Sequence, residues 1–196
     1  SVQRYIPWQF GVNYDVIGRG SAQELFDEQL DVRDLLRPQD NTKWLIISTG
    51  MFTSFLFDPL FGVVDLNTNT VHALGSWNNP VTVTNPEDIG RIAAAILLFE
   101  PSIMNEVVYT AGDTVTYLQL AEIVASVTGG QVIRDLWSVE NLKGSLELRP
   151  DDTMLKYRIV FAEGKGVAWR KEDTFNVLHG LEVTGIERWL QQHRNV

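Results

Sequence analysis

Three aspartates stand where a carboxylate could do chemistry. Asp15 lies in a glycine-bearing loop, Asp88 opens a helical pattern and Asp113 follows a strand pattern. A carboxylate at such a position can act as a general acid or base, or it can cap a helix or bond to a turn. We expect Asp88 to cap its helix and Asp113 to help turn the chain. Asp15 stays open as a catalytic candidate, because loops at strand ends often carry function.

Gln29 is the most informative single residue. A helix is expected over residues 22–37, with Ser21 as its cap and Glu24 completing a capping box. On it, an apolar stripe recurs at i, i+4, i+7 and i+11 through Leu25, Gln29, Val32 and Leu36. An amide in such a stripe must find hydrogen bonds, or its groups stay unsatisfied at a cost of ~1–3 kcal/mol. Gln29 therefore either faces a ligand cavity or bonds to backbone at the edge of the helix.

Aromatic side chains follow a buried strand pattern. The uninterrupted apolar run Trp44–Thr49 predicts a parallel strand that is buried on both faces. Phe52, Phe55 and Phe57 come directly after it. They could line an apolar ligand site or belong to the core. Ligands sit at the carboxyl ends of parallel strands, which keeps the first reading open.

Composition excludes several classes of site. Cysteine is absent, which excludes disulfides, a thiol nucleophile and a Cys-ligated metal, and with only three histidines we expect no metal site. His72 and His179 are expected to be structural. The net charge of −9 disfavours direct binding of nucleic acid. No apolar run could span a membrane and no signal peptide is visible, so we expect no membrane partner and a cytoplasmic location.

The fingerprints of common catalytic folds are also absent. The chain has no G-x-G-x-x-G loop, Walker loop or G-x-S-x-G elbow, and no Tyr is followed four residues later by Lys. Buried strand patterns instead alternate with helical ones, which predicts an α/β fold. The expected strands are 4–7, 44–49, 63–65, 70–74, 81–84, 107–110 and 131–133. The expected helices are 22–37, 86–99, 116–128, 138–148, 152–162 and 184–193.

Five motifs in order resemble the NmrA-like and isoflavone-reductase-like family, which are atypical short-chain dehydrogenases/reductases. The segment over residues 2–11, V-Q-R-Y-I-P-W-Q-F-G, resembles the family's V-K-R-F-I-P-S-E-F-G. Residues 48–52 resemble the family's next strand with its following Phe, and residues 75–78 fall at its G-D-G-N turn. Residues 87–90 read E-D-I-G, like the family's helix start, and residues 105–108 resemble its last core strand.

The resemblance implies the C-terminal part of a Rossmann-type parallel sheet plus a smaller α+β substrate-binding lobe. It assigns residues 1–57 and 86–112 to the Rossmann-like domain, and residues 58–85 and 113–196 to the lobe. Strands 4–7, 44–49 and 107–110 should then run parallel in one sheet, with helices 22–37 and 86–99 packed against it. The family's dinucleotide-binding segment, roughly 100 residues or more with a glycine-rich loop, would precede this chain. We therefore expect that segment, or a second copy of the chain, as a partner.

The resemblance also assigns the site. It puts Gln29 where the family's reductases carry a Lys general acid/base, while Trp8 and Gln9 replace the usual Ser and Glu. The cofactor would be NADP or NAD, with the walls beside its nicotinamide formed by Pro7, Phe10, Gly50, Met51 and Phe52. Trp8 and Phe55 would line the substrate pocket, with Gln29 and Asp15 as the catalytic candidates.

Three functions follow from these features. The first is an NAD(P)-dependent oxidoreductase-type enzyme acting on a small organic substrate. The second is a regulatory protein that senses NAD(P) without turnover, which the change from Lys to Gln29 favours because an amide cannot exchange a proton near neutral pH. The third is a cofactor-independent lyase, cyclase or hydrolase that uses Asp15 or another acid.

Overall fold

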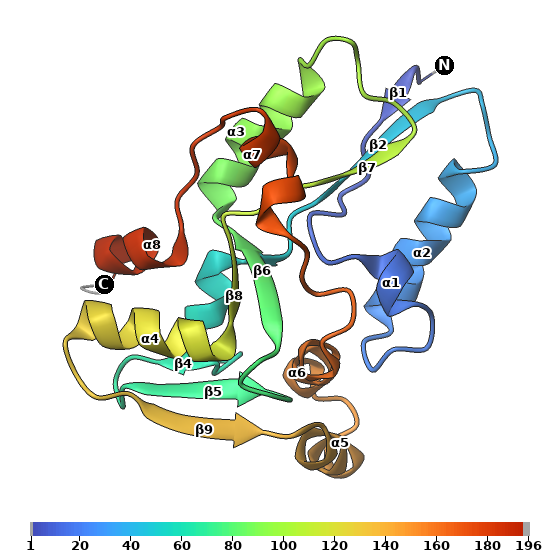
Figure 1. Ribbon diagram of the computed structural model, residues 1–196. Helices are drawn as coiled ribbons and strands as arrows, with labels where there is room; N and C mark the ends of the chain where they lie inside the picture. Colours follow the sequence, from blue (N-terminus) through green and yellow to red (C-terminus); the bar gives the residue numbers. More distant parts are fainter. Residues whose placement is uncertain (1, 194–196) are drawn as a thin grey trace.

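The computed structural model describes residues 2–193, which form an α/β fold with three small sheets (Figure 1). The strands are β1 (Arg4–Tyr5), β2 (Lys43–Ser48), β3 (Met51–Phe52), β4 (Val64–Asp65), β5 (Thr70–Leu74), β6 (Pro80–Thr84), β7 (Glu106–Tyr109), β8 (Asp113–Thr116) and β9 (Ile133–Trp137). The helices are α1 (Tyr14–Ile17), α2 (Leu25–Leu36), α3 (Pro86–Leu97), α4 (Tyr117–Thr128), α5 (Val139–Leu148), α6 (Thr153–Glu163), α7 (Phe175–Leu178) and α8 (Ile186–His193), with 3-10 turns η1 (Thr53–Phe57) and η2 (Lys171–Asp173). In this part of the chain no helix is both long and apolar enough to cross a membrane.

The first sheet has the order β1-β2-β7, and both pairings are parallel. Leu45 opposes Glu106 and Ser48 opposes Tyr109, so β2 is the central strand. Its residues from Trp44 to Ser48 are all buried. This is the burial expected of a parallel strand covered on both faces, and it confirms the predicted parallel arrangement.

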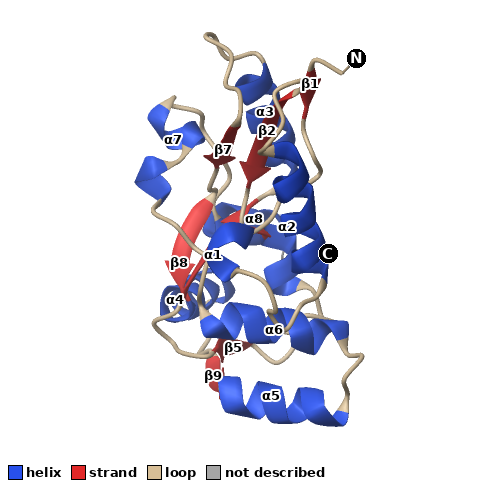
Figure 2. Ribbon diagram, turned by 90° about the vertical axis from the view of Figure 1, so that its right-hand side faces the viewer, coloured by secondary structure: helices blue, strands red, loops and turns tan. Residues whose placement is uncertain are grey.

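Helices cover both faces of this sheet (Figures 1 and 2). Leu45 and Ile47 pack in one cluster with Ile92 and Ile96 of α3, and Val108 of β7 joins them. Side chains alternate along a strand, so the intervening Ile46 points to the opposite face, the side on which α2 lies in Figure 1. The predicted packing of α3 against the sheet is therefore confirmed, whereas the buried apolar residues of α2, Phe26 and Leu30, belong to the other core cluster.

The other two sheets lie below the first in Figure 1. In one, β6 pairs parallel with β3 and antiparallel with β8; in the other, β5 pairs antiparallel with β4 and parallel with β9. β8 was not predicted, and the predicted strand 131–133 is wrong, because β9 runs over Ile133–Trp137. Four of the five β9 residues are exposed, so the strand lacks the apolar pattern that sequence reading depends on. The assignment of residues to two domains stays a prediction.

The start of α2 and its buried face both differ from expectation. The helix begins at Leu25, because the hydroxyl of Ser21 donates to the carbonyl of Gln23 instead of capping the helix. Its buried residues are Phe26, Leu30 and Arg33, so the predicted stripe through Leu25 and Gln29 is not the core face. Arg33 was not part of the predicted stripe, and in the fold its side chain is buried with the side chain of Gln9 as a buried acceptor. Gln29 lies half-buried at the border of the core face.

Asp88 and Asp113 hold the C-terminal segment in place. Asp88 is 2% exposed; it accepts from the backbone N–H of Thr184 at 2.6 Å and pairs with Arg91. Asp113 accepts from Lys171 Nζ at 2.8 Å and from the backbone N–H of Ile186 at 2.6 Å. Both acids therefore have structural roles, but the expectation that Asp88 caps its helix is wrong, because its carboxylate bonds to Thr184 and Arg91 instead. The backbone N–H groups that the two acids accept from, those of Thr184 and Ile186, are more than 50 residues away in sequence.

The turn after β5 fixes the position of α6. Asn79 Nδ2 donates to the carbonyl of Ala162 at 2.8 Å and to that of Leu74 at 3.1 Å. Gly75 has a φ of +74°, and a Cβ on it would lie 2.0 Å from the Ala162 carbonyl oxygen. Only glycine allows this approach, so the turn and the end of α6 are locked together.

Gly75→Ala is therefore expected to destabilise the protein by about 2 kcal/mol or more, because it adds a positive-φ penalty and a backbone clash. Gly144→Ala in α5 is the matched control, since a Cβ there meets nothing within 4 Å. That change should stabilise the protein by about 0.5–1 kcal/mol, because Gly is a poor helix residue. Urea unfolding of both variants measures the difference, and equal stabilities would contradict this account of the turn.

Candidate functional site

A pocket of about 360 Å³ opens beside the first sheet. Four segments supply its walls: the loop after β1, the first half of α2, the segment that follows β2, and α6. The lining residues are Trp8, Phe10, Gly11, Val12, Tyr14, Leu25, Phe26, Gln29, Gly50, Met51, Phe52, Phe55, Met154, Tyr157 and Phe161. Seven of them are residues that the sequence analysis predicted for the site: Trp8, Phe10, Gln29, Gly50, Met51, Phe52 and Phe55.

Backbone hydrogen bonds bring the first and third walls together. The carbonyl of Gly11 accepts from the backbone N–H groups of both Thr49 and Gly50, each at 3.0 Å. The loop after β1 is thus tied to the end of β2. A Cβ on Gly11 would lie 2.4 Å from the hydroxyl oxygen of Tyr14, so glycine lets this ring pack under the loop.

The sequence analysis missed the wall formed by α6. Met154, Tyr157 and Phe161 recur at i, i+3 and i+7, which places them on one side of the helix. That spacing was visible in the sequence, but nothing local indicated that residues so distant from Gln29 would face it. Pro7 is buried and does not line the pocket.

No Asp, Glu, Lys, Arg or His lines this pocket. Its aromatic rings contact one another edge-on, with ring centroids 5.1 Å apart for Tyr14 and Phe26, and 5.8 Å apart for Phe26 and Tyr157. Burial raises the pKa of Tyr14 to about 12 and also raises the pKa of Tyr157. Both phenols are therefore neutral at pH 7, and the pocket is an apolar, uncharged space with a few hydrogen-bonding groups.

Gln29 is held from behind by a buried side chain. Gln9 is 1% exposed; its Nε2 donates to the backbone carbonyl of Gln29 at 2.8 Å. Its Oε1 accepts from Arg33 Nε, also at 2.8 Å. Two of the residues that depart from the family's pattern, Gln9 and Gln29, are thus in direct contact, and this contact fixes α2 against the loop that carries Trp8 and Phe10.

Asp15 lies outside the pocket lining. Its carboxylate accepts from Arg33 Nη1 at 2.6 Å and from Arg37 Nη2 at 2.6 Å. Its hydrogen bonds with Arg37, together with the charge of Arg33, hold the pKa of Asp15 below its usual range. The structure therefore does not bring this catalytic candidate together with the other predicted residues; it places Asp15 in an ion-pair network that joins α1 to α2.

The two candidate histidines have structural surroundings. His72 Nδ1 lies 2.8 Å from the carbonyl oxygen of Gly62, and its ring stacks on Trp137. His179 packs against Phe99 and Phe175. Across residues 2–193 no group of three or more potential metal ligands comes together.

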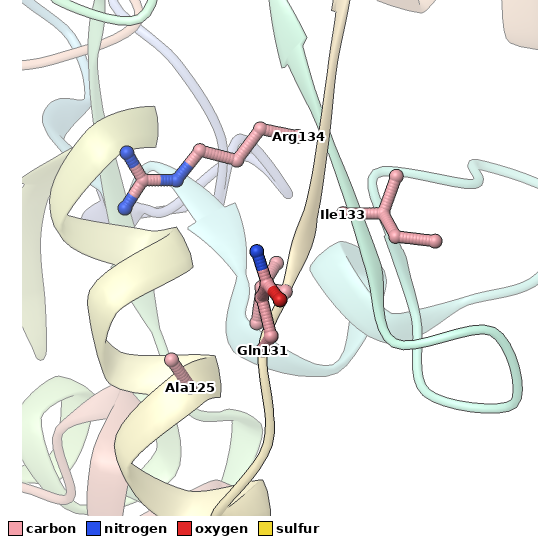
Figure 3. A pocket seen from close by; sticks show the side chains of 5 residues that line it. Ala125, Gln131, Ile133 and Arg134 are labelled. Carbon is pink, nitrogen blue, oxygen red and sulfur yellow. The ribbon is translucent and has the colours of Figure 1, made fainter.

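A larger hollow, of about 630 Å³, lies between α4 and β9. Figure 3 shows Arg134 reaching toward α4, Ile133 pointing the opposite way and Gln131 between them. Its lining is Ala125, Gln131, Val132, Ile133 and Arg134. Arg134 also lies over the Trp77 ring, with its guanidinium carbon 5.8 Å from the ring centroid. This hollow contains no residue predicted for the site and only one charged group, so the apolar pocket is the stronger candidate.

Comparison with known proteins finds relatives that cover nearly the whole chain. Residues 1–189 match the family model described as the NmrA-like family. A protein from Gibberella moniliformis (strain M3125 / FGSC 7600), named NmrA-like family domain-containing oxidoreductase, is 47% identical over 192 residues. The match covers 97% of this chain and 62% of that protein, so the chain spans less than two thirds of this relative's length.

Two solved structures show the fold. An isoflavone reductase superposes with a TM-score of 0.77 at 14% identity, covering 97% of this chain and 66% of the other. AtPrR2 with NADP+ and (+)pinoresinol superposes with a TM-score of 0.74 at 16% identity, covering 97% and 64%. The expected Rossmann-type α/β fold is confirmed.

The ion-pair network behind α2 predicts an acid-sensitive stability. Because the pKa of Asp15 is lowered in the fold, its contribution is present above the unfolded value of about 3.9 and is lost as pH falls through the folded value. Asp15→Asn should therefore lower the free energy of unfolding by about 1–2 kcal/mol at pH 7. The effect is no larger because the carboxylate is partly exposed and water screens its charge. The gap to wild type should close at more acid pH.

Asp31→Asn is the matched control, because Asp31 pairs with Arg19 at the surface and its side chain is 64% exposed. It should change stability by less than about 0.5 kcal/mol at any pH. Urea unfolding of the three proteins from pH 3 to pH 7 provides the comparison. A pH-independent gap for Asp15→Asn would show that the carboxylate's charge is not what stabilises this network.

Proposed function

This chain belongs to the NmrA-like family, and from that premise we propose that it is the later part of an NAD(P)-dependent oxidoreductase acting on a small organic substrate. The observation that carries the proposal is the apolar pocket at the carboxyl ends of β1 and β2. It gathers Phe10, Gly50, Met51 and Phe52 on one side and Gln29 on another. Ligands of open parallel sheets bind at such strand ends.

The residues present fit the nicotinamide end of the cofactor. Phe10, Met51 and Phe52 offer apolar surfaces to a flat ring, and the Gln29 side chain offers an amide that can both donate and accept a hydrogen bond. When bound, the nicotinamide would supply the hydride. No cation lines the pocket, so the cofactor's diphosphate would be held elsewhere, by the part of the longer protein that this chain does not span. NADP and NAD fit these walls equally.

Gln29 would orient the reacting groups rather than exchange a proton. Its amide can donate to a substrate carbonyl or hold the nicotinamide carboxamide, and Gln9 keeps its helix turn in place. Trp8 and Phe55 would contact the substrate. The neutral phenols of Tyr14 and Tyr157 would offer further hydrogen-bonding groups on the pocket wall.

A regulatory protein that binds the dinucleotide without turnover is the second candidate. One observation favours it: no side chain on the pocket wall has a pKa suited to proton transfer near pH 7. A cofactor-independent enzyme that uses Asp15 is not favoured, because that carboxylate is paired with Arg33 and Arg37 away from the pocket.

A partner for β1 is part of the proposal. β1 lies at an edge of its sheet, with β2 as its one neighbour among the described strands, and Tyr5 on it is 44% exposed. An unpaired strand edge readily accepts another strand. The preceding segment of the longer protein, or a second copy of the chain, would pair here.

The division of the cofactor site predicts a difference between the chain and the longer protein. The 196-residue chain alone should bind NADPH weakly or not at all, because its pocket offers no group for the phosphates. The natural full-length protein should bind it at micromolar concentration or tighter. Fluorescence titration of NADPH against both measures this, and saturable low-micromolar binding by the chain alone would reveal a phosphate site within it.

Gln29→Lys tests whether the pocket reduces carbonyls. An ammonium in this apolar pocket has a lowered pKa and can donate a proton, so NADPH-dependent reduction of acetophenone by the full-length protein should rise ~10²–10⁴-fold. Gln29→Met, which keeps the length but removes the amide, should give no such rise. NADPH oxidation and a thermal melt are measured for all three proteins. Zero turnover by every variant, with NADPH still bound, would favour the regulatory function.

A further inference from the structure

Trp8 is the one tryptophan of the chain whose ring is not packed among other side chains. It is 72% exposed, and its ring contact is an edge-on approach to Phe10 with centroids 6.4 Å apart. Its indole Nε1 makes no hydrogen bond to any described residue. Yet it lines the apolar pocket, at the end that faces solvent.

The other five tryptophans have partners or are buried. Trp44 is 7% exposed, and Trp169 donates its Nε1 to the carbonyl of Thr110 at 3.0 Å. Trp137 and Trp189 stack on His72 and Phe57, and Trp77 lies under Arg134. Trp8 alone presents a large flat apolar surface to an open cavity.

The motif that residues 2–11 resemble has Ser at this position, so the ring distinguishes this chain from that motif. Its setting has two properties that a ligand would meet. The cavity of about 360 Å³ is large enough for a small organic molecule. Its walls are mostly aromatic and carry no charged side chain, so an ionised ligand would lose its hydration without gaining a partner.

We propose that Trp8 is a specificity-determining residue of this site: its indole ring is the outer wall on which a flat, uncharged ring ligand stacks. The opposite contacts come from the aromatic walls, and the amide of Gln29 binds a hydroxyl or carbonyl of the ligand. The inference rests on the proposed function only in taking this pocket as the substrate site. Offset stacking of two rings adds to the affinity gained from burial alone.

The experiment compares two ligands that share one ring system. 2-Naphthol is neutral at pH 7, whereas 2-naphthoate carries a charge. Isothermal titration calorimetry with the natural full-length protein should detect binding of 2-naphthol. 2-Naphthoate should bind at least about tenfold more weakly, because no cationic side chain lines the pocket to pair with its carboxylate.

Variants test the ring itself. Trp8→Ser should weaken 2-naphthol binding about tenfold, and Trp8→Phe, which keeps a stacking surface, should stay within about threefold of wild type. Leu178→Ser is the control, since Leu178 is 67% exposed on α7 and does not line the pocket. It should leave binding unchanged.

Each outcome bears on one claim. Unchanged 2-naphthol affinity in Trp8→Ser overturns the proposal for Trp8. If that variant also melts at a lower temperature, the Trp8 ring packs against another part of the full-length protein instead of a ligand. Equal affinity for naphthol and naphthoate overturns the selection for neutral ligands. Wild-type protein that binds NADPH but neither naphthalene overturns the proposal while leaving the proposed function standing. Wild-type protein that binds none of the three contradicts both.

Discussion

Strand β2 must be buried on both faces, and the rest of the molecule follows from that constraint. Its residues from Trp44 to Ser48 are all buried, so an element must cover each face of the sheet and a strand must pair with each of its edges. α3 covers one face through Ile92 and Ile96, and α2 lies across the other (Figure 1). Hydrophobic burial on this scale is the dominant favourable contribution to folding. It also decides where β2 ends, and the chain emerging there forms the floor of the pocket.

The second constraint is a charge buried behind that pocket. The Arg33 side chain is fully buried, and it is tolerated because Gln9 accepts from its Nε and Asp15 accepts from its Nη1. A buried guanidinium without acceptors would be strongly destabilising, so these three residues depend on one another. Because Gln9 also bonds to the backbone of Gln29, the network sets the distance between α2 and the loop carrying Trp8. The geometry of the site is thus coupled to an ion pair that lies outside the pocket lining.

The uncharged character of the pocket limits the chemistry available to it. A reaction that needs a strong general acid would have to take its proton from a phenol whose pKa has been raised by burial, or from water. Positioning and exclusion of water are what such walls supply best. These properties suit a ligand held by its flat faces. They leave the Gln29 amide as a hydrogen-bonding group on an otherwise mostly apolar wall.

The sequence by itself determined the elements whose signals are local. The unbroken apolar run of β2 lies where expected, and α4, α5 and α6 begin within one residue of their predicted starts. The resemblance to the family named Phe10, Gly50 and Phe52 for the site, and all three line the pocket. The tertiary structure decided the rest. Three features depend on contacts between residues far apart in sequence. They are the pairing of Asp15 with arginines instead of the pocket, the choice of the buried face of α2, and the side of α6 that lines the pocket. Periodicity places a side chain on a face of a helix, but only packing decides what that face meets.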